Sequence, residues 1–248
     1  MSKNRTRRAL LTLSAAGLFV WGVNTGLRRW GGPGLAFEPL EDPKGFRRVV
    51  AGEVSRGAFN PLVGLEPAEP GPPRLDDARL CDALFAERRE GTVPVAAFSD
   101  YFCPYCRVLT EELAARHAAG RITITWHELP LLSPLSEPAA RAALAAGLQG
   151  EYPAFHARLM RSRVAAEADY LRSLADSAGL DADRLIDDLT SEEVTRKLVT
   201  AQQLADRFRL YGTPAIVVGQ TLVLGSVTPA TLDDLIAIEA DLPPVCSA

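Results

Sequence analysis

The sequence predicts an α/β fold in which a helical domain interrupts a small sheet, preceded by an N-terminal membrane segment. An uncharged stretch between arginine clusters, from Ala9 to Leu27, predicts the membrane segment. Apolar runs of strand character lie on both sides of residues 133–209, and helical periodicity fills that interval. The 248 residues, 47% of them hydrophobic, are enough for one sizeable core. The net charge of −4 and the lack of a basic stripe indicate that nucleic acid is not a partner.

Residues 1–30 are typical of a segment that meets a membrane. A basic start is followed by 19 uncharged residues, which as a helix would extend about 28 Å. A cleaved signal peptide and an uncleaved signal anchor are both open, and the lack of a small-x-small cleavage site favours the anchor. More positive charge precedes the stretch than follows it, so we expect the body of the protein outside the cytoplasm. In a Gram-negative bacterium the body would lie in the periplasm.

Residues 31–74 are rich in glycine, proline and charged residues, and are interpreted as a spacer with limited order. Two short apolar runs within it, 46–50 and 61–65, are candidates for short strands or packed loops. No function follows from this region.

From residue 75 onward the pattern becomes regular. Breakers such as Gly91, Gly120, Gly150 and Gly179 separate segments of helical period from segments of strand period. The expected elements, in order, are a helix from Asp76 or Asp77 to about Arg89, a strand over 93–98, a helix from Cys103 to about His117, a strand over 121–129, four or five helices over 137–209, a hairpin of strands 215–218 and 221–224, and a helix over 229–240 capped by Thr228.

Removing the central helical block leaves a βαβ unit followed by a hairpin and a helix. That order is the thioredoxin arrangement. We therefore expect residues 75–132 and 210–248 to form a thioredoxin-fold domain, and residues 133–209 to form an inserted helical domain.

The pair Cys103 and Cys106 is the strongest chemical signal in the chain. A C-x-x-C motif between a buried strand and a helix start is typical of a redox dithiol. Pro104 suits the first helical position, so Cys103 would lie at the helix N-terminus, where free N–H groups lower a thiol pKa. Cys103 is thus the expected nucleophile, and Cys106, about one turn later, the expected resolving thiol.

Other interpretations of this motif have less support. A zinc site would need a second Cys/His pair at short spacing, which the sequence lacks, so no metal is expected. An inert structural disulfide at a helix start is a second alternative. We expect the Cys103–Cys106 disulfide itself to be the redox group, with no other cofactor.

Thr213-Pro214 stands directly before the first strand of the hairpin. A cis peptide bond there would leave the backbone of Thr213 open beside Cys103. A substrate peptide could then pair with it by β-augmentation. Thr213 and Pro214 are therefore candidate substrate-binding residues, together with Pro104 and Tyr105 inside the motif.

Several motifs together resemble the DsbA-like thiol–disulfide oxidoreductases, over about residues 75–242. They are Phe98-Ser99-Asp100-Tyr101-Phe102-Cys103-Pro104-Tyr105-Cys106, Glu128-Leu129-Pro130-Leu131-Leu132 with Ser136, Ala139-Ala140-Arg141-Ala142-Ala143, Phe155-His156 and Tyr211-Gly212-Thr213-Pro214-Ala215. The resemblance implies a thioredoxin fold with an inserted helical domain, a cis proline at Pro214 and activity outside the cytoplasm. The better-known oxidases carry histidine where this chain has Tyr105, and C-P-Y-C is also similar to the glutaredoxin motif.

Two acidic residues flank the expected site. Asp100 and Glu128 are candidate proton acceptors for Cys106. The alternatives are a cap or turn residue for Asp100 and a surface charge at a strand end for Glu128. His156 is interpreted as a packed surface histidine rather than a ligand.

Cys81 and Cys246 are an even remainder in an oxidising compartment. They could form a structural disulfide that joins the chain end to the first helix of the domain, or remain two separate thiols, because spacing does not determine pairing.

The sequence thus predicts an extracytoplasmic thiol–disulfide oxidoreductase, most simply an oxidase of secreted proteins. Its expected partners are protein or peptide thiols and disulfides, a membrane redox partner, and the membrane itself through residues 1–30. A reductase or isomerase of the same fold is the first alternative. A binding protein that handles metal through thiolates is the second, although no additional Cys or Met-rich motif supports it.

Overall fold

The computed structural model describes residues 35–50, 53–56, 73–162 and 167–246. The predicted membrane segment and the run 61–65 lie outside these residues. In the described part of the chain, no helix has the length and apolar character needed to cross a membrane. Residues from Phe37 onward form one compact unit, so contacts do not separate the helical insertion from the sheet.

A six-stranded mixed sheet forms the centre of this unit, in the order β1-β2-β6-β5-β3-β4. Strands β3 and β4 are parallel, β5 is antiparallel to β3 and β6, and β2 runs parallel to β6. The strands are β1 (Phe37–Pro39), β2 (Arg47–Val50), β3 (Val93–Ser99), β4 (Ile122–Glu128), β5 (Ala215–Val218) and β6 (Thr221–Leu224). The two parallel strands and the hairpin predicted from the sequence are confirmed, and two short segments of the expected spacer extend the sheet as β1 and β2.

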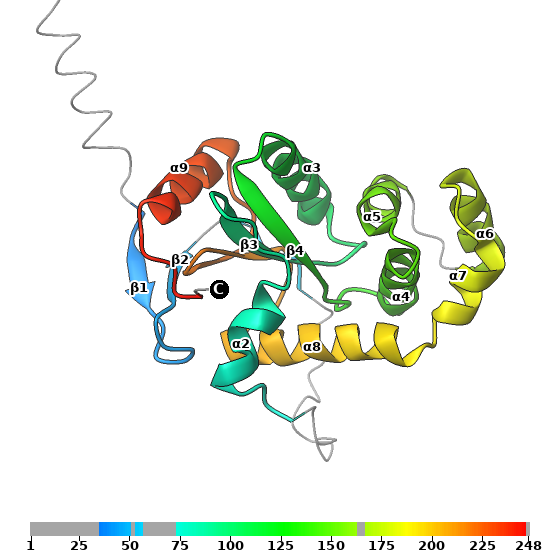
Figure 1. The fold of residues 1–248 in the computed structure, drawn as a ribbon, viewed down its shortest axis with the longest axis horizontal. Coiled ribbons are helices and arrows are strands. Elements are labelled where there is room, and N and C mark those ends of the chain that lie inside the picture. The colour runs from blue at the N-terminus through cyan, green and yellow to red at the C-terminus, as the bar shows by residue number, and fades with distance from the viewer. Residues whose placement is uncertain (1–34, 51–52, 57–72, 163–166, 247–248) are drawn as a thin grey trace, which may run out of the picture. The chain divides into compact units, whose positions relative to one another are not determined.

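Helices cover both faces of the sheet, as Figure 1 shows: α3 and α9 lie on one face, α2 and α8 on the other, and α4 to α7 stand to one side. The helices are α2 (Asp77–Leu84), α3 (Pro104–Ala118), α4 (Ser136–Gly147), α5 (Tyr152–Arg161), α6 (Ala168–Ser177), α7 (Ala182–Asp188), α8 (Glu192–Phe208) and α9 (Pro229–Ala240). Among its described residues, the interval predicted to be helical therefore contains five helices, α4 to α8. The thioredoxin arrangement with added helices is the observed fold.

The first helix is shorter than predicted. The periodicity indicated a helix to about Arg89, but α2 ends at Leu84. Phe85 leaves the helical conformation, while its N–H still donates to Cys81 O at 2.9 Å. Its ring is 1% exposed and packs in the core with Leu84 and Phe98. Burial of this large ring stabilises the early end of the helix, which propensity alone does not reveal.

In the part of the chain that the structure describes, two apolar clusters make up the core. One packs α2 and α8 against the sheet, with Phe85, Phe98 and Phe208 as its large members. The other fills the helical insertion and extends to Cys103 and Cys106. The cysteine motif therefore packs against the inserted helices.

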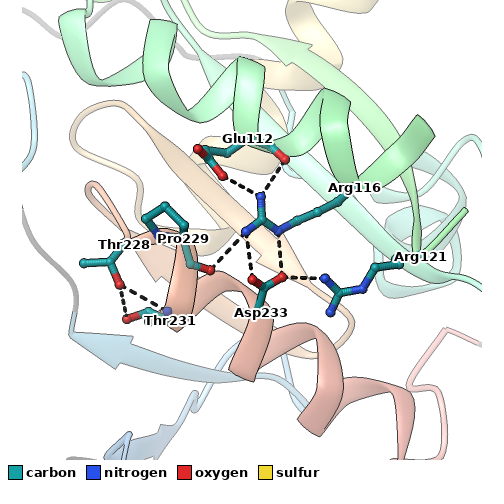
Figure 2. A network of polar contacts seen from close by, with 7 residues as sticks. All are labelled: Glu112, Arg116, Arg121, Thr228, Pro229, Thr231 and Asp233. Carbon is teal, nitrogen blue, oxygen red and sulfur yellow. Dashed lines mark hydrogen bonds and ion pairs between the residues drawn. The ribbon is translucent and has the colours of Figure 1, made fainter. Parts of the chain in front are cut away.

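The helix that carries the cysteine motif is fastened to α9 by Arg116 (Figure 2). Its Nε and Nη2 donate to the two carboxylate oxygens of Asp233 at 3.0 and 3.1 Å, and Nη2 also donates to Pro229 O at 3.0 Å. Its Nη1 donates to the carbonyl and the carboxylate of Glu112. Arg121 donates to the same Asp233 carboxylate. These bonds hold the C-terminal end of α3, whereas the cysteine motif lies at its N-terminal end.

Candidate active site

Cys103 is the N-cap residue of α3, directly after the turn that follows β3. Its backbone is extended, Pro104 begins the helix, and the N–H of Cys106 donates to Cys103 Sγ at 3.3 Å. This is the geometry that the proline and the C-x-x-C spacing predict. Both cysteines are free thiols and both are buried.

Hydrogen bonding lowers the pKa of the Cys103 thiol to about 6. The largest contribution is the hydrogen bond from the Cys106 thiol, which outweighs the opposing effect of burial. The Ser55 and Thr213 hydroxyls and the N–H of Cys106 lower it further. A proton presented to the sulfur favours the thiolate, and the N–H of Cys106 lies 3.3 Å from Cys103 Sγ.

Cys106 has the opposite character. Burial, its hydrogen bond to Cys103 and the charge of Cys103 raise its pKa far above the ordinary value. One sulfur is thus a thiolate near neutral pH while its neighbour keeps a proton. Such a pair is suited to thiol–disulfide exchange, in which the low-pKa sulfur both attacks and leaves readily.

Thr213-Pro214 is a cis peptide bond directly before β5. The sequence predicted that the backbone of Thr213 would be open to a substrate. Instead Ser55 occupies it: Ser55 N–H donates to Thr213 O at 2.7 Å, and Thr213 N–H donates to Ser55 O at 2.9 Å. The backbone of Thr213 is thus already paired with another segment of the same chain. Ser55 is a residue of this site that sequence reasoning missed.

Asp100 is buried and its carboxylate is fully engaged. It accepts bonds from the N–H groups of Phe102, Leu131 and Leu132 and from the Ser136 hydroxyl, at 2.7–3.0 Å. These bonds tie the turn before Cys103 to the loop after β4 and to the start of α4. Its backbone, rather than its carboxylate, is among the groups that shift the pKa of Cys106. The geometry favours a positioning role, and proton transfer by Asp100 stays a prediction.

Glu128 ends β4 inside the protein, 1% exposed, rather than at the surface. Its Oε1 accepts from the hydroxyls of Tyr101 and Tyr152, both at 2.5 Å, and lies 3.1 Å from His156 Nδ1. Its Oε2 has no hydrogen-bond partner among the described residues. Burial and the nearby Glu128 charge raise the pKa of both tyrosines well above the ordinary value. A role for Glu128 in proton transfer to Cys106 stays a prediction.

His156 was interpreted as a surface histidine, and this is wrong, because its side chain is 1% exposed. Its Nδ1 lies 2.7 and 3.0 Å from the Tyr101 and Tyr152 hydroxyls, and Nε2 is 3.4 Å from Thr110 Oγ1. Tyr152 and His156 are four residues apart on α5, so both reach Glu128 from one face. That spacing was visible in the sequence, whereas the meeting of α5 with the end of β4 was not.

The remaining residues of the motif lie at the surface of the site. Pro104 is exposed, and Tyr105 is half-buried against the cluster of the helical insertion. Both can contact a substrate, and their assignment to substrate binding stays a prediction.

Cys81 on α2 and Cys246 near the chain end form a disulfide, with an S–S distance of 2.04 Å. It lies on the α2 side of the sheet, in the cluster of Phe85 and Phe98. In residues 35–50, 53–56, 73–162 and 167–246, no group of three acidic, histidine or cysteine side chains is placed to hold a metal ion.

Comparison with known families gives a match over most of the described chain. The model of the DSBA-like thioredoxin domain matches residues 94–237, more than half of the sequence. This interval includes both cysteines of the motif, the cis proline and the helical insertion.

Several solved structures have a similar fold. A thioredoxin-like oxidoreductase from Silicibacter pomeroyi DSS-3 is 35% identical, with a TM-score of 0.60, over 65% of this chain and 98% of that one. A periplasmic thioredoxin-like protein from Salmonella enterica serovar Typhimurium is 25% identical, with a TM-score of 0.58, over 68% and 99%. The thiol-disulfide exchange protein alpha-DsbA2 from Wolbachia pipientis, 20% identical with a TM-score of 0.59 over 65% and 92%, shares the fold.

Two curated relatives are of another kind. The Na(+)/H(+) antiporters NhaA 3 of Salinispora tropica and NhaA 1 of Salinispora arenicola are 30% and 31% identical over 135 residues. The match covers 52% of this chain and 20% of each antiporter, so the chain spans about a fifth of their length.

Proposed function

The chain belongs to the DSBA-like thioredoxin domain family of thiol–disulfide oxidoreductases, and from this premise we propose that it oxidises protein dithiols outside the cytoplasm, with Cys103 as nucleophile and Cys106 as resolving thiol. The observation that carries the proposal is the divided acidity of the two sulfurs. The pKa of Cys103 is lowered to about 6, whereas that of Cys106 is raised.

Exchange would proceed from the Cys103–Cys106 disulfide. A substrate thiolate attacks Cys103 Sγ, the bond to Cys106 breaks, and Cys106 leaves and takes up a proton, as its raised pKa favours. A second substrate thiolate then attacks the mixed disulfide, and Cys103 leaves as a thiolate. The substrate loses two electrons, the dithiol gains them, and a membrane redox partner would remove them again.

The direction of electron flow follows from which form of the pair is more stable. A stabilised Cys103 thiolate favours the reduced dithiol, which makes the disulfide form a stronger oxidant. Tyr105 replaces the histidine of better-known oxidases, but hydrogen bonds to Cys103 supply the stabilisation in its place. These bonds support oxidation over the alternative of a reductase or isomerase.

Location outside the cytoplasm is part of the proposal. The uncharged stretch behind a basic start supports an export signal or a signal anchor, and the Cys81–Cys246 disulfide supports an oxidising compartment. The Salmonella enterica protein of similar structure is described as periplasmic. We propose that residues 1–30 hold the protein at the membrane.

The test combines activity and potential. The purified, oxidised protein is mixed with a reduced peptide that carries two cysteines, and formation of the peptide disulfide is followed by mass spectrometry. Cys103→Ser and Cys106→Ser should each abolish the reaction, because neither variant can form the site disulfide. When Cys106→Ser is given the peptide in its disulfide form instead, the Cys103 thiolate should attack it and accumulate the mixed disulfide, while one peptide sulfur leaves as a thiolate. The matched variant Arg79→Ala, at an exposed position on α2, should react normally.

The reduction potential then separates the alternatives. A value near about −120 mV supports the oxidase, whereas a value near about −270 mV indicates a reductase. Full dithiol oxidation by Cys103→Ser would refute the assignment of the nucleophile. Stoichiometric metal bound to the dithiol, without exchange, would favour a metal-handling protein.

A further inference from the structure

The segment Glu53–Arg56 pairs with the edge of the site like a bound peptide. Ser55 and Thr213 exchange both backbone hydrogen bonds, at 2.7 and 2.9 Å, in an antiparallel bridge. Glu53 extends the pairing, because its carbonyl accepts from Ser226 N–H at 2.8 Å and its N–H donates to Ser226 Oγ at 3.0 Å. Four backbone groups of this segment are therefore bound at the edge beside the cis proline.

The side chains of this segment alternate, as they do in a strand. Val54 and Arg56 both lie over Gly212, so alternation places the Ser55 side chain on the opposite side, and its hydroxyl is one of the groups that lower the pKa of Cys103. Arg56 turns to the other side, where its guanidinium lies 4.6 Å from the centre of the Tyr211 ring. Val54 packs over Gly212, on the same side as Arg56.

Gly212 shows how close this approach is. A Cβ at this position would lie 2.5 Å from Ser55 O and 2.5 Å from Val54 Cγ1. Any larger residue would push the segment away from the edge. A residue without a side chain is what a close backbone approach requires.

The nucleophile beside this segment is buried. Cys103 is 0% exposed, although its chemistry needs contact with a second sulfur. Serine differs from cysteine by one atom, oxygen for sulfur, so Ser55 presents its hydroxyl where a substrate cysteine would present its thiol.

We propose that Glu53–Arg56 is an internal pseudosubstrate, with Ser55 in the place of the substrate cysteine, and that protein substrates must displace it. This inference rests on the proposed function and adds a substrate class to it. The preferred substrate is an extended peptide with an aliphatic residue before its cysteine and an arginine or lysine after it. The side chain after the cysteine would replace Arg56 over Tyr211.

The first test is a cross-link. In Ser55→Cys/Cys106→Ser, oxidised glutathione first caps Cys103, and the new thiolate then attacks Cys103 Sγ. The bond from Cys103 to glutathione breaks, and glutathione leaves as a thiolate that takes up a proton. Because Cys106 is replaced, nothing resolves the new disulfide, which is located by mass spectrometry of non-reduced peptides.

The matched control is Val54→Cys/Cys106→Ser, because side chain 54 points away from Cys103. We expect the disulfide to Cys103 to form at least about tenfold faster from position 55 than from position 54, since proximity dominates intramolecular exchange. Equal rates from both positions, or no cross-link from position 55, would overturn the proposal.

The second test measures access to Cys103. At pH 8, where this thiol is ionised, Ser55→Pro lacks the N–H that bonds Thr213 and should be alkylated by iodoacetamide about fivefold faster than wild type. Ser55→Ala keeps both backbone bonds and should remain within about twofold of wild type. Equal rates for all three proteins would contradict an occupied edge, and circular dichroism checks that each variant is folded.

Substrate preference distinguishes this inference from the proposed function. Two reduced dithiol peptides, alike except for arginine or glutamate after the reacting cysteine, are compared by kcat/KM. We expect about threefold in favour of arginine, the effect of an exposed cation over an aromatic ring. Oxidation of both peptides at equal rates refutes the pseudosubstrate's specificity but keeps the oxidoreductase, whereas oxidation of neither peptide refutes the proposed function.

Discussion

At the scale of single residues, the acidity of Cys103 comes from hydrogen bonds rather than from a neighbouring positive charge. The Cys106 thiol contributes most, and the Ser55 and Thr213 hydroxyls add to it. Tyr105 carries no positive charge that could stabilise the Cys103 thiolate. The motif alone therefore does not predict how far the pKa of Cys103 is lowered. The local hydrogen-bond geometry decides it.

The titration of Cys103 tests this account. Thiolate absorbance near 240 nm should rise with pH around a midpoint of about 6, because the raised pKa of Cys106 keeps that thiol protonated in this range. Since the shift is downward from 9.0, it stabilises the reduced fold fully above pH 9, and this contribution is lost as the pH falls through about 6. Cys103→Ser should remove the transition, and a midpoint near 9 would contradict the hydrogen-bond account.

Glu128 permits a second prediction at this scale. Glu128→Gln removes the charged acceptor of two buried tyrosine hydroxyls, and we expect the free energy of unfolding in urea to fall by about 1–3 kcal/mol. Glu111→Gln, at an exposed position on α3, is the matched control. Its unfolding should match that of wild type.

Exchange kinetics of the same variant separate structure from proton transfer. If Glu128 only stabilises the fold, Glu128→Gln should exchange dithiols at a rate near that of wild type. If Glu128 relays a proton to Cys106, the substitution should lower the rate by about a hundredfold, as loss of general acid–base catalysis does. Unchanged stability in Glu128→Gln would contradict the buried network itself.

Sequence reasoning succeeded at residues whose role depends on near neighbours. The C-x-x-C spacing, the proline at the helix start and the Thr213-Pro214 pair each predict a local geometry, and the structure has those geometries. Ser55 and Tyr152 were missed, because each reaches the site from a distant part of the chain. No local pattern marks such residues.

At the scale of elements, α3 matters because it presents the cysteine motif while its far end is fixed. Arg116→Ala would remove five hydrogen bonds from a side chain that is 9% exposed. We expect the free energy of unfolding to fall by about 2 kcal/mol, since bonds to a charged group are the strong ones and the partners here are partly solvated. The exposed Arg79→Ala is the control.

The pH dependence of this difference provides an independent check. Arg116 is the main cause of the lowered pKa of Asp233, so the pair stabilises the fold above the ordinary aspartate value of 3.8. The contribution is lost as the pH falls below that value and the carboxylate is protonated. The gap between wild type and Arg116→Ala should therefore shrink in acid, and a gap that widens would contradict the ion pair.

Most elements could be predicted because their boundaries are local. Glycine breakers, the Thr228 cap and the change from strand to helical period give the order of strands and helices from β3 to α9. The early end of α2 could not be predicted, since it depends on the burial of Phe85 among residues far along the chain. The same holds for β2, whose register with β6 joins residues about 170 positions apart.

At the scale of the whole molecule, two described segments before residue 57 pair with residues far along the chain. Strand β2 extends the sheet beside β6, and Glu53–Arg56 pairs with the backbone of Thr213 and Ser226, next to Pro214. Composition suggested a spacer, because glycine, proline and charge are typical of one. Composition does not predict this pairing, because a few backbone hydrogen bonds suffice to bind such a segment to other strands.

The Cys81–Cys246 disulfide acts at the same scale, because it joins residues 165 positions apart, and Cys103, Cys106 and Pro214 lie between them. A cross-link over so long a loop restricts the unfolded chain, and Cys81→Ser/Cys246→Ser should lower the free energy of unfolding by about 2–5 kcal/mol. Thermal and urea unfolding of oxidised wild type and the double variant measure the difference.

The active pair supplies the control for that measurement. Cys103→Ser/Cys106→Ser keeps the long-range disulfide, so mild reduction should leave its unfolding midpoint unchanged until Cys81–Cys246 itself is reduced. Dithiol exchange should persist in the Cys81→Ser/Cys246→Ser protein below its lowered midpoint, because neither residue is among those that shift the pKa values of the two site sulfurs. Loss of exchange in that variant while it remains folded would show that the second disulfide takes part in the redox chemistry rather than in stability.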